Sequence, residues 1–570
     1  MNRVLTLLLF LFISIASFGQ QQKLSTSGYP EHYIDIELHS KAEVNGLAAR
    51  FSVDKVHFNK ETNTYEVRLW LPQREYHSFE ELNIPYSIVQ QDKSKATAGM
   101  ANSYEELVQA WDKYPTYQAY LEAMSYFQNQ YPDICKIDTI LANTVSGHQI
   151  LVAHISNTLN DSIDKPSFFY TSTIHGDEVT GYYLMLRLIH YILHNQDEPR
   201  VAEILNGVDL WICPLENPDG TYHTGNHIIG TSPISTRANA NGFDLNRNYP
   251  LINGSSTSPY QPEIQAMMNF MTKRNFVMSA NLHGGAELFN YPWDSYTSYQ
   301  KLHPDTPWWL SVGRAFADTC HRKKSTYFME QDRGVTHGGD WYVITGSRQD
   351  YANYFLHCRE VTIEISIDKV LPNEQLNNYW QYTNSSLFNL IRQVQYGFRG
   401  RVVDSLSQEP LHAKIVIEQY DDLSQHSEVY SRSSSGNYYR PILPGSYNVT
   451  ISAEGYIPQT HTVNVSTDKS YTSNVTLSKK LGIENYVTPK YKLYPNPANS
   501  HLTLTLISEP IEKEWVEIID MYGRCLQTFP VTTQTTTFSV AHLLPGYYLL
   551  RTSFGEGKFV IIESSSPFSR

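Results

Sequence analysis

A histidine and a glutamate three residues apart are the first candidates for chemistry in this sequence. His175 and Glu178 lie at the end of an apolar run. An imidazole nitrogen and a carboxylate oxygen suit Zn²⁺, and a catalytic zinc normally has three protein ligands and a water molecule. A third ligand must then come from elsewhere, and His283 is the candidate, in the strand-like segment 276–285. Because the chain contains 21 histidines, the pair alone does not identify a metal site.

The elements around this pair place it at the end of a strand. Residues 167–171 predict a buried strand, and apolar residues recur at helical spacing after the pair. These residues are Leu184, Leu188, Ile189, Ile192 and Leu193. In open α/β sheets, ligands bind at the carboxyl ends of the strands, so this strand-to-helix junction is where a site is expected.

Polar residues in two later segments could complete such a site. A loop-like segment contains Arg237, Asn246 and Arg247. A guanidinium beside an amide can hold a carboxylate by charge-assisted hydrogen bonds, and a second arginine can polarise a carbonyl. Glu364, on a predicted strand, could take a proton from zinc-bound water, whose pKa zinc lowers to about 7. Each of these residues could equally be an ordinary solvated residue.

The length and the net charge of the chain limit the classes of protein to which it can belong. The chain has 570 residues, of which 41% are hydrophobic and 18% charged, so it is globular and long enough for three or four domains. The formal charge is -13, from 44 basic and 57 acidic residues. The sequence has no basic run, so we do not expect nucleic acid as a partner.

The first residues predict export. Residues 1–19 have a basic start at Arg3, an apolar core and small residues before Gln20, which is typical of a secretory signal peptide. We expect no membrane span elsewhere, so the mature protein is predicted to be soluble or attached to the cell surface. Five cysteines without Cys-x-x-Cys spacing make disulfides optional and a cysteine metal site improbable.

Changes in pattern divide the rest of the chain. Residues 20–100 contain alternating strands and are an accessory domain or a pro-domain; no cleavage site identifies the latter. Residues 101–396 alternate strands and helices, including a helix at 117–131, and predict an α/β domain with a mixed sheet flanked by helices. A β-sandwich is expected at 397–480. A linker (481–490) and a last all-β unit (491–570) follow.

Six motifs of the α/β segment follow one another in the order of a known family. The sequence resembles the zinc metallocarboxypeptidases of the funnelin type, and is most similar to the branch with carboxypeptidases D, E, M and N. The resemblance implies a sheet of the eight-stranded type. The motifs are His175-Gly-Asp-Glu178, Asn217-Pro-Asp-Gly220, Asp244-Leu-Asn-Arg247, Asn281-Leu-His-Gly-Gly285, Asn290-Tyr-Pro-Trp-Asp294 and Glu360-Val-Thr-Ile-Glu364.

The resemblance implies hydrolysis of the last peptide bond of peptides or proteins. One zinc ion would be held by His175, Glu178 and His283. Glu364 would be the general base and acid, and Arg237 would stabilise the oxyanion.

The family also implies how a substrate would be held. Asn246 and Arg247 match the pair that grips the terminal carboxylate, and Tyr342 matches the tyrosine that closes over it. Asp294 and Gln349 match residues that line the side-chain pocket of basic-residue-specific members. A carboxylate there would favour C-terminal Lys or Arg by roughly 1.5–3 kcal/mol. Asp294 could instead only cap the segment that follows it.

The chain departs from the family pattern in places. Gly346-Ser347 replaces paired glycines, and Tyr351 stands where a tryptophan is common. The N-terminal segment does not match the inhibitory pro-region of the digestive branch.

The C-terminal domains carry resemblances of their own. The sandwich at 397–480 resembles a transthyretin-like domain, and 491–570 is similar to the sorting domain of type IX secretion. This implies contact with the secretion machinery and export through the periplasm to the cell surface or the medium. An immunoglobulin-like binding module is the alternative for the last unit.

Two other functions stay open from the sequence. One is a carboxypeptidase for apolar, acidic or cell-wall termini; the other is a surface protein that binds peptides without cleaving them. A serine hydrolase is disfavoured because the sequence has no Gly-x-Ser-x-Gly motif.

Overall fold

The computed structural model describes residues 31–89, 99–159, 165–223, 225–228, 235–255, 259–480, 491–507, 514–521, 523–552 and 555–562. The predicted signal peptide (1–19) and linker (481–490) lie outside these residues. The chain divides into two compact units, Met1–Ser478 and Lys479–Arg570.

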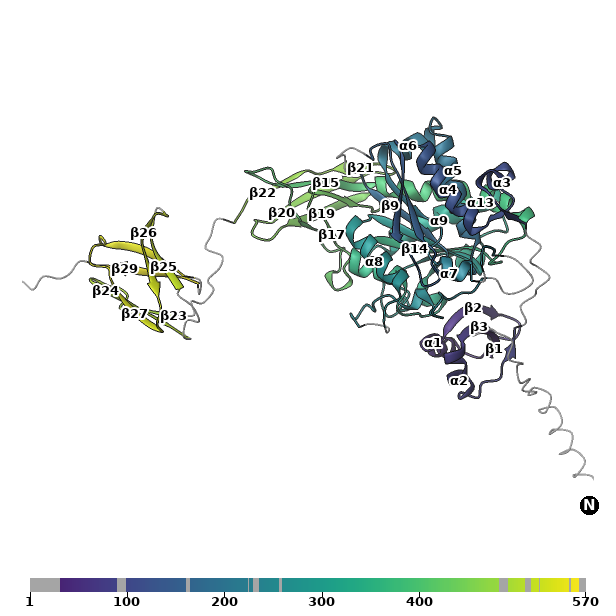
Figure 1. Cartoon of the computed structure of the whole chain (residues 1–570), viewed down its shortest axis with the longest axis horizontal. Helices are drawn as coiled ribbons and strands as arrows, with labels where there is room; N and C mark the ends of the chain where they lie inside the picture. The colour runs from purple at the N-terminus through teal and green to yellow at the C-terminus, as the bar shows by residue number, and fades with distance from the viewer. Residues whose placement is uncertain are drawn as a thin grey trace, which may run out of the picture. The chain divides into compact units, whose positions relative to one another are not determined.

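A mixed sheet of eight strands forms the centre of the first unit, as predicted (Figure 1). Its order is β13-β12-β14-β11-β9-β10-β8-β7. The neighbours of β11 are parallel to it, whereas β12 runs antiparallel to β14. The bounds are β7 Cys135–Leu141, β8 Ile150–Ile155, β9 Ser167–Ser172, β10 Asp209–Cys213, β11 Met278–His283, β12 Ala286–Tyr291, β13 Val335–His337 and β14 Arg359–Ser366.

Helices cover both faces of this sheet, and its central strands are buried on both sides. Every residue of β9, β11 and β14 is buried, which is typical of parallel strands between two helical layers. Phe168 and Phe169 accordingly enter two different hydrophobic clusters. On one face lie α4 Tyr117–Gln130, α5 Thr180–His194, α6 Pro199–Gly207, α9 Thr306–Lys323 and α13 Asn373–Arg392; on the other lie α8 Pro262–Arg274 and α12 Arg348–Leu356.

An N-terminal module, residues 31–88, has a small core of its own. Its sheet has the order β2-β3-β1-β4, and helix α1 starts with a capping box between Ser40 and Glu43. Three of its strands lie where the alternation predicts them. The bounds are β1 Glu31–Leu38, α1 Lys41–Ala48, β2 Ser52–Asn59, β3 Thr64–Pro72, α2 Gln73–Glu80 and β4 Ser87–Ile88.

The segment after α13 is a sandwich of two sheets around one apolar core. One sheet consists of β15 Gly397–Asp404, β18 Asn437–Arg440, β21 Ser470–Thr472 and β22 Val475–Leu477; the other of β16 Lys414–Ile417, β17 Val429–Tyr430, β19 Gly445–Ser452 and β20 Gln459–Val465. The second unit is also all-β, with the sheets β23-β24-β27 and β26-β25-β28-β29. Its strands are β23 Tyr491–Tyr494, β24 His501–Leu506, β25 Glu514–Asp520, β26 Cys525–Val531, β27 Thr535–Ser539, β28 Gly546–Thr552 and β29 Gly555–Ile561.

No helix among the described residues is long and apolar enough to cross a bilayer. All five cysteines lie in the described part of the chain and are free thiols.

A buried cluster of charges joins the sandwich to the α/β domain. Asp305 accepts hydrogen bonds from Arg359 Nε (2.9 Å) and from Arg440 Nη1 (2.9 Å) and Nη2 (2.8 Å). Burial would raise the pKa of Asp305, but Arg440 and Arg359 hold it below its ordinary value. The carboxylate therefore stays charged. Together with Asp421, which accepts from Arg440 Nη2 (2.8 Å), it balances two guanidinium groups that are cut off from water.

This cluster yields a stability prediction. Asp305→Asn removes the charge that both arginines share, and breaking a buried ion pair in this way costs about 3–5 kcal/mol. We expect a large fall in the urea midpoint of unfolding. Glu203→Gln is the control, because the pair of Glu203 with Arg392 is about one-third exposed and such pairs contribute about 0–1 kcal/mol. Equal midpoints for the two variants would contradict the role of the cluster.

Candidate active site

Three neighbouring parallel strands end at one edge of the sheet and carry the candidate residues there. His283 is the last residue of β11 and is paired in register with Glu364 of β14. On the other side of β11, the chain leaves β9 at Thr173, whose φ of 63° is unusual for a β-branched residue. The turn that follows brings His175 and Glu178 back over the end of β11. This is the edge at which open α/β sheets bind ligands.

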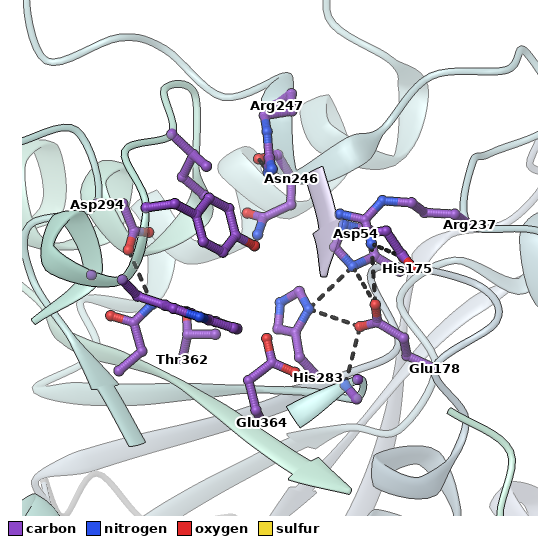
Figure 2. Close-up of a pocket in the computed structure, with 17 residues that line it drawn as sticks. Asp54, His175, Glu178, Arg237, Asn246, Arg247, His283, Asp294, Thr362 and Glu364 are labelled. Carbon is purple, nitrogen blue, oxygen red and sulfur yellow. Dashed lines mark hydrogen bonds and ion pairs between the residues drawn. The ribbon is translucent and has the colours of Figure 1, made fainter. Parts of the chain in front are cut away.

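The three proposed metal ligands come together at this edge (Figure 2). Their ligand atoms all lie within 4.8 Å of one another. Nδ1 of His175 lies 3.0 Å from Glu178 Oε1 and 3.2 Å from His283 Nδ1. Nδ1 of His283 lies 2.9 Å from Glu178 Oε2. All three side chains are buried. His175 and His283 are 108 residues apart in the sequence.

This donor set fits a zinc ion. Two ligands about 2.1 Å from a tetrahedral zinc lie roughly 3.4 Å from each other, close to the separations between these atoms. Two imidazole nitrogens and one carboxylate are also the ligand types of a known class of catalytic zinc sites. Burial lowers the pKa of His283 to about 4, so its ring is neutral near pH 7, as a metal ligand must be.

A carboxylate behind the ligands orients His175. Asp244 Oδ1 lies 3.0 Å from His175 Nε2. Burial would raise the pKa of Asp244, but Arg237 and His175 hold it well below its ordinary value. An acceptor at Nε2 places the ring proton there and leaves the Nδ1 lone pair toward the metal position, as outer partners of metal-bound histidines do.

Arg237 connects this carboxylate with the ligand Glu178. Its Nε donates to Asp244 Oδ2 (3.1 Å) and its Nη1 to Glu178 Oε1 (3.2 Å). The guanidinium is only 3% exposed. It therefore lies at the edge of the metal position with its charge balanced by buried acids.

Glu364 lies next to His283 and lines the same cavity (Figure 2). Its Oε2 is buried and has no hydrogen-bond partner among the described residues. Burial and the neighbouring Glu178 raise its pKa well above the ordinary value of a glutamate. A carboxyl group in this setting is suited to accept and return a proton.

Cationic and amide groups line the cavity on the side away from the metal ligands. Asn246 and Arg247 lie on a short turn that is fixed by the hydrogen bond from Arg348 N to Asn246 Oδ1 (3.0 Å). Nε and Nη2 of Arg247 are buried and have no partner in the described part of the chain. Free, forked N–H donors at this position can receive a carboxylate. Tyr342 also lines the cavity.

Asp294 lines the cavity, whereas Gln349 lies behind it. Nε2 of Gln349 donates to Asp294 Oδ1 (2.9 Å), and its Oε1 accepts from Thr362 N (2.7 Å). Gln349 is thus a support for Asp294 in this structure. Gly338 lies so close to Asp294 that any side chain at this position would clash: an added Cβ would lie 2.2 Å from Asp294 Oδ1. Absence of a side chain at Gly338 keeps that carboxylate open to the cavity.

Sequence reasoning missed three charged residues of the site. Asp244 belongs to a motif that the sequence displays, so its position could have been noticed. Asp54, from the N-terminal module, lines the cavity, and Lys369 lies 3.6 Å from Glu178. No spacing or motif in the sequence points to either residue.

The metal position yields a prediction. His283→Ala leaves two of three protein ligands, so the variant should lose most of the zinc that the wild type retains after dialysis. Metal content measured by plasma mass spectrometry tests this. His77→Ala, at an exposed ring of the N-terminal module, should keep the wild-type content. Full zinc occupancy in His283→Ala would show that the metal binds elsewhere.

Comparisons with known proteins match three segments of the chain to domain families. A zinc carboxypeptidase model matches residues 120–386, a carboxypeptidase regulatory-like domain matches 397–478, and a secretion system C-terminal sorting domain matches 492–563. The sorting domain indicates export to the cell surface or the medium.

Three curated relatives are similar over most of the same region. Human carboxypeptidase D is 31% identical over 412 residues, which are 69% of this chain and 28% of that protein; the chain thus spans little more than a quarter of that relative. Carboxypeptidase SOL1 of Arabidopsis thaliana is 32% identical, over 60% of this chain and 68% of its own. Carboxypeptidase M of Mus musculus is 30% identical, over 60% and 77%. The chain belongs to the zinc carboxypeptidase family.

Proposed function

We propose that the protein is a zinc-dependent carboxypeptidase that hydrolyses the last peptide bond of peptides or proteins, with a preference for C-terminal Lys or Arg. One observation carries the proposal. A single cavity is lined by the three metal ligands, by Glu364, by the donors of Arg247 and by the buried carboxylate of Asp294. These are the groups needed to hold a peptide by its terminal carboxylate and last side chain while its last amide is attacked.

The reacting groups divide the work of hydrolysis. Zn²⁺, when bound by His175, Glu178 and His283, supplies a Lewis acid that polarises a carbonyl and acidifies water. Glu364 takes the proton of the attacking water and returns it to the leaving amine.

Arg237 stabilises the charge that develops on the carbonyl oxygen. Its guanidinium is buried beside Glu178, where hydrogen bonds to a developing charge are stronger than in water. Loss of one such donor typically costs about 2.7–4 kcal/mol of transition-state stabilisation. Asn246 and Arg247 hold the terminal carboxylate, so the enzyme acts at chain ends and not at internal bonds.

Asp294 selects the side chain of the last residue. It is 3% exposed and receives hydrogen bonds from Gln349 and from Asn290 Nδ2 (3.2 Å). Both bonds stabilise its charged form, which would pair with a Lys or Arg side chain. A buried ion pair of this kind requires both partners, so apolar C-terminal residues leave the carboxylate without compensation.

The C-terminal unit delivers the enzyme to its place of action. The sorting domain at 492–563 would be recognised by a type IX secretion machinery after passage through the periplasm. The substrates would then be peptides or proteins outside the cell.

A first variant tests the catalytic role of Glu364. Glu364→Gln keeps the shape of the side chain but cannot accept a proton, so turnover should fall by about 10²–10⁴-fold, while zinc content and melting temperature stay at wild-type values. Release of arginine from an Arg-terminated peptide measures turnover. Near-normal turnover in this variant would refute the assignment.

A second test concerns Asp294 and pH. Burial raises the pKa of Asp294 above its ordinary value, so the carboxylate takes up a proton as the pH falls through this raised pKa. The ratio of kcat/KM for Arg-terminated to Phe-terminated peptides should therefore decrease toward acid pH. The ratio cancels effects of the shared catalytic groups. In Asp294→Asn the ratio should be low and independent of pH; a wild-type ratio in that variant would exclude Asp294 as the selecting group.

A further inference from the structure

The segment that carries Asp294 is attached to the C-terminal sandwich by a buried hydrogen bond. Nε1 of Trp293, the residue before Asp294, donates to Gln425 Oε1 of the sandwich (2.9 Å). Trp293 is fully buried and Gln425 is 8% exposed, so neither group can turn to water if the other is lost. The bond therefore ties the residue next to the selecting carboxylate to a different domain.

The sandwich holds the Gln425 amide in one orientation. A single 3₁₀ turn, Leu423–Gln425, ends at this residue. Asp422, directly before the turn, accepts from Ser424 N (2.9 Å) and from Gln425 Nε2 (2.8 Å). An ionised carboxylate can only accept and an indole N–H can only donate, so the amide NH₂ faces Asp422 and the amide oxygen faces Trp293. Gln425 is thus oriented toward Trp293 by its own domain.

The next residue of the sandwich contacts the helix that supports Asp294. The His426 ring stacks on Tyr354 of α12, with ring centroids 4.1 Å apart and planes inclined by 14°. The first turn of the same helix carries Gln349, which donates to Asp294 Oδ1 (2.9 Å), and Asp350, which accepts from Asp294 N (2.8 Å). Two consecutive sandwich residues therefore contact both supports of Asp294, which are the preceding tryptophan and helix α12.

The backbone around Asp294 leaves little room for displacement. Trp293 N donates to His337 Nε2 (3.1 Å), and Trp293 O accepts from Gly339 N (2.9 Å). Gly338, between these two residues, lies against the Asp294 carboxylate. A shift of Trp293 would therefore also shift the selecting group. A misplacement of about 1 Å in an active site can lower the rate roughly 100-fold.

We infer that the sandwich takes part in substrate selection, with Gln425 as a positioning residue that holds Asp294, through Trp293, where it binds the last side chain of the substrate. This inference rests on the proposed function and deepens it. The alternative is that Gln425 only stabilises the contact between the domains. That role predicts a lower melting temperature and an equal effect on every substrate.

The test compares Gln425→Ala with the wild type as zinc-loaded full chains at neutral pH. We expect kcat/KM for an Arg-terminated peptide to fall by about ten-fold, because its charged side chain meets a displaced carboxylate. The value for a Phe-terminated peptide should not change. Gln459→Ala is the matched control: Gln459 is on β20 of the same sandwich and donates to Thr476 O (2.8 Å), a bond within that domain. It should leave both values unchanged.

A double-mutant cycle tests whether Gln425 acts through Trp293. Trp293→Phe removes the Nε1 donor and keeps an aromatic ring, so it should lower the ratio of the Arg to the Phe value by a similar factor. Gln425→Ala added to Trp293→Phe should lower this ratio no further. Circular dichroism monitors folding, and Trp293→Phe keeps the inference testable if Gln425→Ala does not fold.

Three results would contradict the inference. A wild-type ratio in a folded single variant, or additive losses in the double variant, would overturn the positioning role and leave the proposed function intact. An equal loss of kcat/KM for both peptides would assign Gln425 to stability alone. A wild type that cleaves both peptides equally well would refute the preference for Lys or Arg, and this inference with it.

Discussion

The site depends on the mutual neutralisation of charges that are shut away from water. The carboxylates of Glu178, Asp244 and Asp54 surround Arg237. The side chain of Arg237 is 3% exposed. A buried ion without a partner costs several kcal/mol, so these groups stabilise one another by pairing. The parallel strands bring the histidines and Glu364 to this cluster, in which Asp244 contacts His175 and Glu178 contacts His283.

A divalent ion would fit into this balance of charge. Glu178 accepts from Arg237 and from the backbone N–H of Gly284 (3.2 Å), and its two oxygens lie 3.0 Å from His175 Nδ1 and 2.9 Å from His283 Nδ1. A cation between Glu178, His175 and His283 would be held by ligand atoms that already lie within 4.8 Å of one another. The burial that makes the site costly without an ion also makes interactions with a substrate strong, because the effective dielectric constant is low.

The sequence predicted the fold, and it pointed to most residues of the candidate site, for identifiable reasons. Strands alternate with amphipathic helices along residues 101–396, so the α/β class follows from periodicity. His175, Glu178, His283, Asn246, Arg247 and Glu364 belong to motifs with fixed spacing, and the motifs lie at ends of strands. The departures at Ser347 and Tyr351 are accommodated: Ser347 Oγ caps helix α12 by accepting from Asp350 N (3.2 Å), and Tyr351 packs against Tyr249.

Contacts between distant segments could not be predicted. Asp54 lies 183 residues before Arg237, and Asp305 lies 135 residues before Arg440. Neither pair has a spacing or a motif, because the geometry arises only when separately folded layers dock. The sequence also could not predict that Gln349 lies behind Asp294 and supports it. A motif indicates that two residues are near each other, but not which side chain faces the cavity.

X-ray absorption at the zinc edge of the loaded protein tests the central claim most directly. The account predicts a first shell of nitrogen and oxygen atoms at about 2.0–2.2 Å, with outer-shell scattering from two imidazoles. Sulfur neighbours at about 2.3 Å, or a shell without imidazole, would contradict it.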